Sequence, residues 1–375
     1  MSKKLFIGIM TGTSADGIDI ALVSVTESFL NIIDSQSQDL ADDIQAEIKA
    51  LCQPCANELF RAHSLGIKLS LICADIINTI IKKNCLSPQD ITAIGFHGQT
   101  IRHHPDTHPA FSIQIGCPST LAHHTKIKTI ADFRMADIAA GGQGAPLVPA
   151  FHMAAFHSES ENRLIINIGG IANISYLPAN KDFNPSGFDT GPGNTLLDEW
   201  IFKCQQKTYD FEGQWATTGS VILNLLEDMM SDKYVLKPAP KSTGKEYFNL
   251  DWLEDLLKLY PKSKNEDIQR TLLEFTCLCL TSSVRSIIDS SNSNKPFCIY
   301  LCGGGINNSF LVERLARLNK NIDIKSTLAL GIHPQLVEAS AFAWLASRTN
   351  LNLPSNLKSA TGADSDKVLG GIYPA

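Results

Sequence analysis

The turn at residues 11–17, Thr-Gly-Thr-Ser-Ala-Asp-Gly, joins two apolar runs and carries more polar groups than a reversal of chain direction requires. A two-residue hairpin turn needs only Asn-Gly or Asp-Gly. The glycines let backbone approach a ligand closely, and successive N–H groups in such a turn form an anion-binding nest. Asp16 or Asp19 could hold Mg²⁺, directly or through water. An elaborate β-turn, in which Ser, Thr and Asp bond their own backbone, explains the same residue types without a ligand.

Two further glycine turns have the composition of a nucleotide site. Gly169-Gly170 separate two apolar runs, with Asn173 close behind, although glycine pairs are common in ordinary hairpins. The triple glycine at 303–305, followed by Asn307, comes after a buried apolar run and opens a helical pattern. Bare backbone there suits a flat adenine or ribose edge, and a helix N-terminus suits an α-phosphate. The spacing is not that of a Rossmann dinucleotide fingerprint, and the turns together suggest the phosphates of a nucleotide.

The acid with the most distinctive surroundings is Asp189, in GFDTGPGNTLLDEW at 187–200. Three glycines and a proline surround it, which predicts a rigid loop immediately before a helix. A carboxylate in such a loop is suited to be a base that removes a proton from a hydroxyl or from water. In phosphoryl transfer the protein mostly positions and neutralises the reacting groups, so one such acid suffices. A helix N-cap or an Asx-turn is the alternative role for the same residue.

Four other polar residues are candidates for binding a substrate. His97 and Gln99, in GFHGQT, and Arg134, in ADFRMAD, end apolar runs, where an α/β sheet presents its ligand-contacting edge. The planar guanidinium of Arg134 suits a substrate carboxylate. Glu338 stands on an otherwise apolar helical pattern and could face a cleft. The alternatives are a packed histidine, a surface ion pair for the arginine, and a solvent edge for the glutamate.

The elements that would position these residues alternate between strand and helix patterns in two halves. We expect an N-terminal lobe over 1–140 and a C-terminal lobe over 141–375, with the last helix able to return to the first lobe. The Gly-rich stretch 135–150 is the expected crossing between them. Each half begins with a strand–turn–strand unit, a weak internal repeat that would aim two turns at one ligand. Strands are expected over 4–10, 18–25, 29–37, 111–116, 128–134 and 295–302 and in two runs within 163–177, and residues 91–100 are expected to pass from strand into loop. Helices are expected over 41–52, 57–84, 118–124, 220–230, 249–259, 266–290, 306–318 and 334–348, with 102–110 as a loop.

Bulk composition excludes several classes of protein. The 375 residues carry a net charge of −6 and no long basic run, which argues against a nucleic-acid surface. The ten cysteines show no disulfide or zinc spacing, and Cys52 and Cys55 form a lone C-x-x-C. A signal peptide and an apolar run of membrane-spanning length are not expected. These features predict a reduced, cytoplasmic protein that binds neither nucleic acid nor membrane.

Eight motifs spread along the chain together resemble the anhydro-N-acetylmuramic acid kinases, within the superfamily of actin, sugar kinases and heat-shock chaperones. They are GIMTGTSADGID, GFHGQT, ADFRMADIAAGGQGAPLVP, NIGGIANIS, GFDTGPGNTLLD, CGGGINN, VEASAFAWLA and the closing SATGA…VLGGIYPA. One departure is Thr11, where the family pattern has Ser; the hydroxyl is kept.

The resemblance implies an α/β, two-lobed actin-like ATPase fold, built from duplicated ribonuclease H-like domains, with ATP in an interlobe cleft. It implies hydrolytic opening of 1,6-anhydro-N-acetylmuramic acid and phosphorylation of O6 in peptidoglycan recycling, with ATP, Mg²⁺ and a homodimer. Asp189 would activate water, Arg134 would meet the lactyl carboxylate, and His97, Gln99 and Glu338 would contact the sugar. A kinase of another sugar and a non-catalytic nucleotide switch remain the alternatives. The implied phosphate-binding residues are Gly12, Thr13, Ser14, Ala15, Asp16, Gly17, Ile18, Asp19, Gly169, Gly170 and Asn173, the nucleoside-binding residues Gly303, Gly304, Gly305 and Asn307, and the magnesium ligands Asp16 and Asp19.

Overall fold

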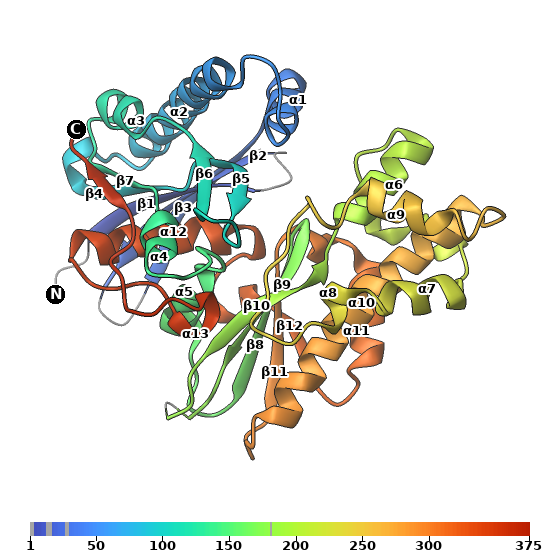
Figure 1. The fold of residues 1–375 in the computed structure, drawn as a ribbon. Coiled ribbons are helices and arrows are strands. Elements are labelled where there is room, and N and C mark those ends of the chain that lie inside the picture. Colours follow the sequence, from blue (N-terminus) through green and yellow to red (C-terminus); the bar gives the residue numbers. More distant parts are fainter. Residues whose placement is uncertain (1–3, 13–16, 27–29, 181) are drawn as a thin grey trace. The chain divides into compact units, whose positions relative to one another are not determined.

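The computed structural model describes residues 4–12, 17–26, 30–180 and 182–375 and divides the chain into two compact units (Figure 1). Unit 1 comprises residues 1–155 and 335–375, and unit 2 comprises residues 156–334. This division differs from the expected boundary after residue 140. Residues 141–155 and the whole C-terminal segment from 335 lie in unit 1, so the Gly-rich stretch 135–150 is internal to that unit.

Unit 1 is built on a six-stranded sheet with the order β13-β7-β4-β1-β2-β3. Strands β1, β2 and β3 are antiparallel neighbours, whereas β1, β4 and β7 run parallel. Strands β5 and β6 form a separate two-stranded antiparallel sheet in the same unit. The strands are Lys4–Thr11 (β1), Gly17–Val25 (β2), Leu30–Asp39 (β3), Ile91–Phe96 (β4), Gln99–His104 (β5), Phe111–Ile115 (β6), Thr129–Ala131 (β7) and Gly371–Tyr373 (β13).

Alternation along the strands sends apolar side chains to both faces of this sheet. Ile7 and Ile9 of β1 pack in a core with α2, while Phe6 and Met10 pack with α12 on the other face. Figure 1 shows α1, α2 and α3 on one side of the sheet and α4 and α12 on the other. The helices of the unit are Asp42–Leu51 (α1), Glu58–Lys83 (α2), Pro118–Thr125 (α3), Met135–Ala139 (α4), Val148–Phe156 (α5), which ends at the unit boundary, Val337–Asn350 (α12) and Lys358–Thr361 (α13).

Unit 2 repeats the same strand order around a five-stranded sheet, β10-β9-β8-β11-β12. Again the first three strands are antiparallel, and β8, β11 and β12 are parallel. The strands are Asn162–Ile168 (β8), Ile171–Leu177 (β9), Ser186–Pro192 (β10), Phe297–Cys302 (β11) and Asp323–Ser326 (β12). The weak repeat expected from the two hairpins therefore extends to the topology of both sheets.

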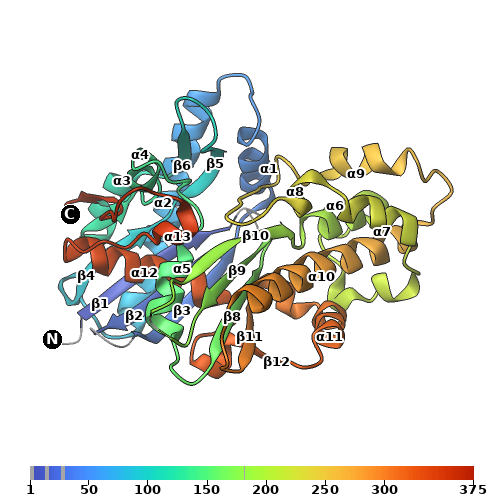
Figure 2. The ribbon, with the colours of Figure 1, turned by 60° about the horizontal axis from the view of Figure 1, so that its bottom comes forward.

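Helices cover one face of the second sheet, as Figure 2 shows for α10 and its neighbours. Its apolar core joins Ile166 and Ile174 of the sheet to Leu272 and Phe275 of α10. The helices are Thr195–Gln205 (α6), Leu223–Met230 (α7), Lys233–Leu236 (α8), Leu250–Leu257 (α9), Asn265–Ser290 (α10) and Ser309–Leu318 (α11).

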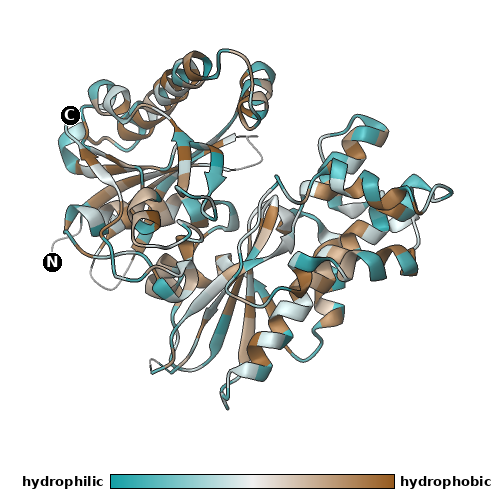
Figure 3. Cartoon of the chain, in the orientation of Figure 1, coloured by the Kyte–Doolittle hydropathy of each residue, from teal (hydrophilic) through white to brown (hydrophobic). Residues whose placement is uncertain are grey.

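Two helices, α2 and α10, are long and apolar enough to cross a membrane by length and composition. In the most apolar 18-residue stretch of each helix, 56% of the residues of α2 and 72% of those of α10 are buried inside the protein. Apolar and polar stretches alternate along α2 in Figure 3, as on an amphipathic core helix. Buried core helices satisfy the same composition test, and charged residues interrupt the sequence of both helices, so the expectation that no continuous apolar run reaches membrane-spanning length is not contradicted.

Two local expectations also differ from the structure. Residues 187–192 were expected as a loop but form β10, which pairs with β9. Residues 102–104 were expected in a loop and instead complete β5. In both cases glycine, proline or histidine conceals a strand that pairing with a neighbour stabilises.

Candidate active site

In unit 2, the glycine turns meet at one edge of the sheet. Gly169-Gly170 follow β8, and Gly303-Gly304-Gly305 follow β11, which runs parallel to β8. The carboxyl ends of parallel strands share an edge, which is where α/β sheets bind ligands. A Cβ on Gly303 would overlap the Asn167 side chain, and Gly303 has a φ of 81°. No other residue type fits there without displacing its neighbours.

The start of α6 holds the Gly169-Gly170 turn in place. The backbone N–H of Gly193 donates to the Gly170 carbonyl at 2.8 Å, and that of Asn194 donates to the Gly169 carbonyl at 2.8 Å. The Thr195 N–H adds a third bond, to the Gly170 carbonyl at 3.1 Å. These three bonds fix the turn and the start of an eleven-residue helix as one backbone unit.

Asp189 lies on β10, opposite Asn173 of β9. Its Oδ2 accepts hydrogen bonds from Ser242 Oγ and from the Thr243 N–H, both at 3.0 Å. The N-cap of α6 is Asn194. The Asp189 carboxylate is thus held by residues 242 and 243, which are distant in sequence. It does not cap the helix that follows it, as the helix-cap alternative would require, because Asn194 is the N-cap.

The segment that holds Asp189, residues 241–245 (Lys-Ser-Thr-Gly-Lys), was not predicted to belong to a site. The Lys241 carbonyl accepts from the Asp189 N–H at 3.1 Å, and its Nζ donates to the carbonyls of Tyr234 and Val235. Burial lowers the pKa of this lysine. The Tyr234 hydroxyl donates to the Asp189 carbonyl at 2.8 Å. The signal in the sequence was a run of hydroxyls and glycine between two lysines, in a stretch with no helical or strand period.

In unit 1, the predicted residues also gather at the carboxyl ends of parallel strands. Thr11 ends β1, His97 and Gln99 follow β4, and Arg134 follows β7. The Thr11 hydroxyl donates to the Gly98 carbonyl at 2.7 Å, which joins the first two strand ends. Gly12, Gly17, Ile18 and Asp19 lie in or beside the strand pair β1–β2, whereas Thr13, Ser14, Ala15 and Asp16 lie outside the described residues.

Arg134 and His97 form a direct pair. The His97 Nε2 accepts from Arg134 Nε at 3.2 Å and lies 2.9 Å from its Nη2, while Nη1 donates to the Gly144 carbonyl at 2.7 Å. Burial and the adjacent guanidinium hold the pKa of His97 well below its usual range. The imidazole is therefore neutral, with its proton on Nδ1. Its ring packs on Phe342 of α12 at 4.6 Å, so His97 orients the guanidinium.

Glu338, near the start of α12, belongs to the same edge of the unit 1 sheet. Burial raises its pKa to about 7; the Arg134 guanidinium opposes the shift, and the Asp19 carboxylate adds to it. Asp19 Oδ1 accepts from Ser37 Oγ at 2.5 Å. Two acids and one arginine thus act on one another at this edge, and Glu338 can exchange a proton near neutral pH.

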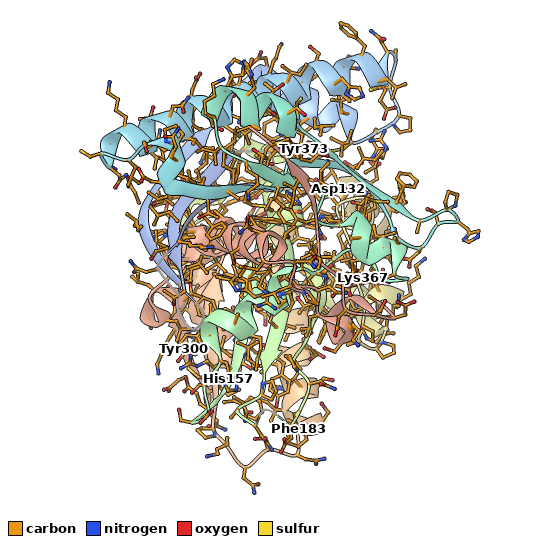
Figure 4. All side chains as sticks on the ribbon, turned by 90° about the vertical axis from the view of Figure 1, so that its left-hand side faces the viewer. Asp132, His157, Phe183, Tyr300, Lys367 and Tyr373 are labelled. Atoms are coloured by element: carbon orange, nitrogen blue, oxygen red, sulfur yellow. The ribbon has the colours of Figure 1, made fainter. Side chains whose placement is uncertain are left out.

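A cavity of about 310 Å³ lies beside His97 in unit 1, lined also by Gln114, Asp132, Met135 and Tyr373. Figure 4 shows Asp132 and Tyr373 close to one another. Burial raises the pKa of Asp132. The volume is at the lower limit of small-molecule sites.

A magnesium ion would find few protein ligands here. Within the described ranges no three His, Cys, Asp or Glu residues form a cluster that could hold a metal. Mg²⁺ typically takes one or two carboxylates with water and substrate phosphates, so its binding does not require such a cluster. Asp19 is suited to that role, and Asp16 lies outside the described residues.

These features define a class of protein. Two sheets with the same mixed strand order, each with polar residues where its parallel strands end, make up the duplicated ribonuclease H-like fold of the actin-like ATPases and sugar kinases. Within this class the chain belongs to the anhydro-N-acetylmuramic acid kinase family, whose sequence profile matches residues 4–375.

Curated relatives match the whole chain. The anhydro-N-acetylmuramic acid kinase of Shewanella baltica strain OS155 is 44% identical over 375 residues, which is 100% of both chains. That of Shewanella woodyi is 43% identical over 375 residues, with the same coverage. Among solved structures, a ROK family glucokinase from Streptomyces griseus in complex with glucose and AMPPNP covers 92% of this chain and 99% of its own, at 10% identity and a TM-score of 0.38. That alignment adds nothing to what the strand order already shows.

Proposed function

We propose that this kinase uses ATP and water to convert 1,6-anhydro-N-acetylmuramic acid into N-acetylmuramate 6-phosphate and ADP. Membership of the family supports the substrate and the reaction. The observation that carries the proposal is the Asp189 carboxylate, held by Ser242 and Thr243 on the strand next to the Gly169-Gly170 hairpin. A fixed base beside an anion-binding turn is what phosphoryl transfer to an activated oxygen requires.

In the proposed reaction Asp189 takes one proton from water as the water oxygen bonds to the anomeric carbon. The bond between that carbon and O6 breaks, and O6 bonds to the γ-phosphorus as the bond from phosphorus to ADP breaks. The proton on Asp189 then passes to solvent, so the sequence consumes one water and one ATP. The hydrogen bonds from Ser242 and Thr243 both go to Asp189 Oδ2, an arrangement that orients the carboxylate as a base.

The unit 1 residues supply recognition and proton handling in this proposal. Arg134, held by His97 and the Gly144 carbonyl, meets the lactyl carboxylate of the sugar. Glu338, with its pKa near 7, gives a proton to or takes one from the sugar oxygens near neutral pH. Gln99, which is buried two residues after His97, would contact the sugar.

The nucleotide would be held by backbone. Residues 12–19, Gly169, Gly170 and Asn173 bind phosphate, and Gly303, Gly304, Gly305 and Asn307 contact the nucleoside. Asp19, and by the sequence Asp16, would hold magnesium, which when bound neutralises phosphate charge.

The proposed setting is peptidoglycan recycling in the cytoplasm by a homodimer. Cys73, Cys277 and Cys298 are free thiols in the core, as is usual in a reducing compartment. Sedimentation of the purified protein would test the dimer.

The deciding experiment is mass analysis of the sugar after incubation with ATP, magnesium, the anhydro-sugar and water labelled with heavy oxygen. We expect a product heavier by one phosphoryl group and one labelled water. Asp189→Asn keeps an acceptor for the Ser242 and Thr243 donors but removes the base, so it should lower the rate by about 10²–10⁴-fold. Asp251→Asn, at an exposed residue of α9, is the matched control and should retain activity.

Other outcomes select the alternatives. ADP formed with a phosphorylated but unlabelled sugar would identify a kinase of a plain hydroxyl. Nucleotide binding without any sugar product would point to a nucleotide switch. Full activity of Asp189→Asn would remove the base from this mechanism.

A further inference from the structure

The Gly169-Gly170 turn has a positively charged neighbour that the reaction above does not use. A Cβ on Gly170 would lie 3.0 Å from Lys245 Cε and 3.7 Å from Lys245 Nζ, so the ammonium group stands directly over this glycine. Lys245 is half-buried and ends the 241–245 segment. The charge is therefore fixed at the turn rather than extended into solvent.

A buried hydroxyl faces the same glycine. The Thr195 Oγ1 lies 2.8 Å from the Cβ position of Gly170, and the residue is only 3% exposed. Within the part of the chain that the structure describes, this oxygen has no hydrogen-bond partner, and neither does Thr243 Oγ1. Buried polar atoms are nearly always paired, so an unpaired hydroxyl beside an ammonium group and a helix N-terminus is the arrangement that an oxyanion would complete.

The 241–245 segment connects this arrangement to the base. The Thr243 N–H and the Ser242 hydroxyl hold the Asp189 carboxylate, and Lys245, two residues further on, reaches the Gly170 turn. The phosphoryl group in transfer is the part of ATP that must approach the oxygen released by the action of Asp189. A cation placed by the same segment as the base is therefore suited to that phosphoryl group rather than to the remote α-phosphate.

We propose that Lys245 and Thr195 bind the γ-phosphoryl group of ATP and stabilise it during transfer. The inference deepens the proposed function and rests on it for the identity of the acceptor. As the bond from phosphorus to ADP breaks and the bond to O6 forms, negative charge spreads over the phosphoryl oxygens and the departing ADP oxygen. A preorganised ammonium and hydroxyl lower the energy of that charge distribution.

The test compares Lys245→Met, which keeps length and removes charge, with Lys245→Arg, which keeps charge. Lys258→Met, at an exposed lysine of the same unit, is the control. Lys245→Met should lower kcat by about 100-fold, in the range found when one donor to a transition-state oxyanion is removed. Lys245→Arg should recover part of that loss, and Lys258→Met should match the wild type.

Binding gives a readout that does not need the sugar. By calorimetry, Lys245→Met should weaken AMPPNP at least about tenfold and leave ADP within about twofold, because ADP lacks the γ-phosphate. Thr195→Val should also weaken the affinity for AMPPNP more than the affinity for ADP. This second variant keeps the test valid if Lys245→Met fails to fold. Equal weakening of both nucleotides, or unchanged affinity for both, would overturn the proposal.

The two proposals fail in different ways. If the wild type forms no phosphorylated sugar, the proposed function is wrong, and the AMPPNP-to-ADP ratio still decides the role of Lys245. If the wild type forms the product and Lys245→Met retains wild-type kcat, the inference about Lys245 is wrong and the function stands.

Discussion

At the scale of single residues, the two acids assigned to the reaction have opposite surroundings. Asp189 accepts hydrogen bonds from the Ser242 hydroxyl and the Thr243 N–H on one oxygen, which fixes the orientation of its carboxylate. Glu338 is held among buried groups near Asp19, and its pKa is raised to about 7. An oriented carboxylate is suited to act as a base, and a carboxyl group whose pKa is near neutral is suited to exchange protons.

The raised pKa of Glu338 predicts a pH-dependent gain in stability on its removal. Above pH 7 the Glu338 carboxylate of the folded protein is ionised. The ionised form is more stable in the unfolded chain, where the glutamate pKa is near 4.5, so ionisation lowers the free energy of unfolding. Glu338→Gln should therefore raise the free energy of unfolding by up to about 3 kcal/mol at pH 8. The gain should shrink as pH falls through 7 and vanish below 4.5, where both states of the wild type are protonated. Urea unfolding at several pH values measures it.

Activity should change in the opposite sense. Glu338→Gln cannot exchange a proton, so kcat should fall although the variant is more stable. A stability difference that is constant between pH 5 and 8 would contradict the raised pKa.

At the scale of secondary structure, the position of Glu338 depends on how closely α12 approaches its sheet. A Cβ on Gly8 of β1 would overlap the Ala339 carbonyl oxygen, and one on Gly95 of β4 would overlap the Phe342 carbonyl oxygen. Two missing side chains on neighbouring parallel strands thus let the helix backbone rest on the sheet. Ala339, the residue directly after Glu338, is one of the contact points.

Gly8→Ala should separate this helix from the sheet. We expect a loss of about 3 kcal/mol in the free energy of unfolding, at the upper end of overpacking costs. At temperatures where the variant stays folded, activity should also fall because Glu338 moves with the helix. Gly304→Ala is the matched control for stability, since a Cβ there meets nothing within 4 Å. Equal unfolding midpoints for the two variants would show that α12 can retreat without cost.

Sequence patterns could predict most elements but not all contacts between them. The periodicity of α2 and α10 and the hairpins β1–β2 and β8–β9 is local, so their ranges were expected within a few residues. β10 was not, because its glycines and proline resemble a loop and only pairing with β9 makes it a strand. The 241–245 segment was missed for a related reason: its role depends on contacts with Asp189 and Gly170, more than 50 residues away in sequence. The assignment of residues 335–375 to unit 1 likewise rests on long-range packing.

At the scale of the whole molecule, the two units are variations on one design. In both, three antiparallel strands are followed by parallel ones, and polar residues collect where the parallel strands end. Unit 1 places Thr11, His97 and Arg134 there, and unit 2 places its glycine turns and Asp189. In the proposed function the two edges would have different roles: the unit 1 edge would bind the sugar acid, and the unit 2 edge, with its backbone groups and Lys245, would bind phosphate.

If both edges serve one reaction, ligands should protect both units from hydrogen exchange. We expect AMPPNP with magnesium and the anhydro-sugar to slow amide exchange in peptides covering 4–20 and 95–104 of unit 1, and 165–175 and 238–248 of unit 2. Helices α7 and α9 serve as internal controls, since no site residue lies on them and their exchange should not change. The nucleotide alone should protect the unit 2 peptides and the first turn, because phosphate is held by backbone N–H groups, while protection at 95–104 should require the sugar. Protection confined to unit 2 under all conditions would show that the turn at 11–17 is an ordinary β-turn, and the phosphate role would then rest on the Gly169-Gly170 hairpin and its neighbours alone.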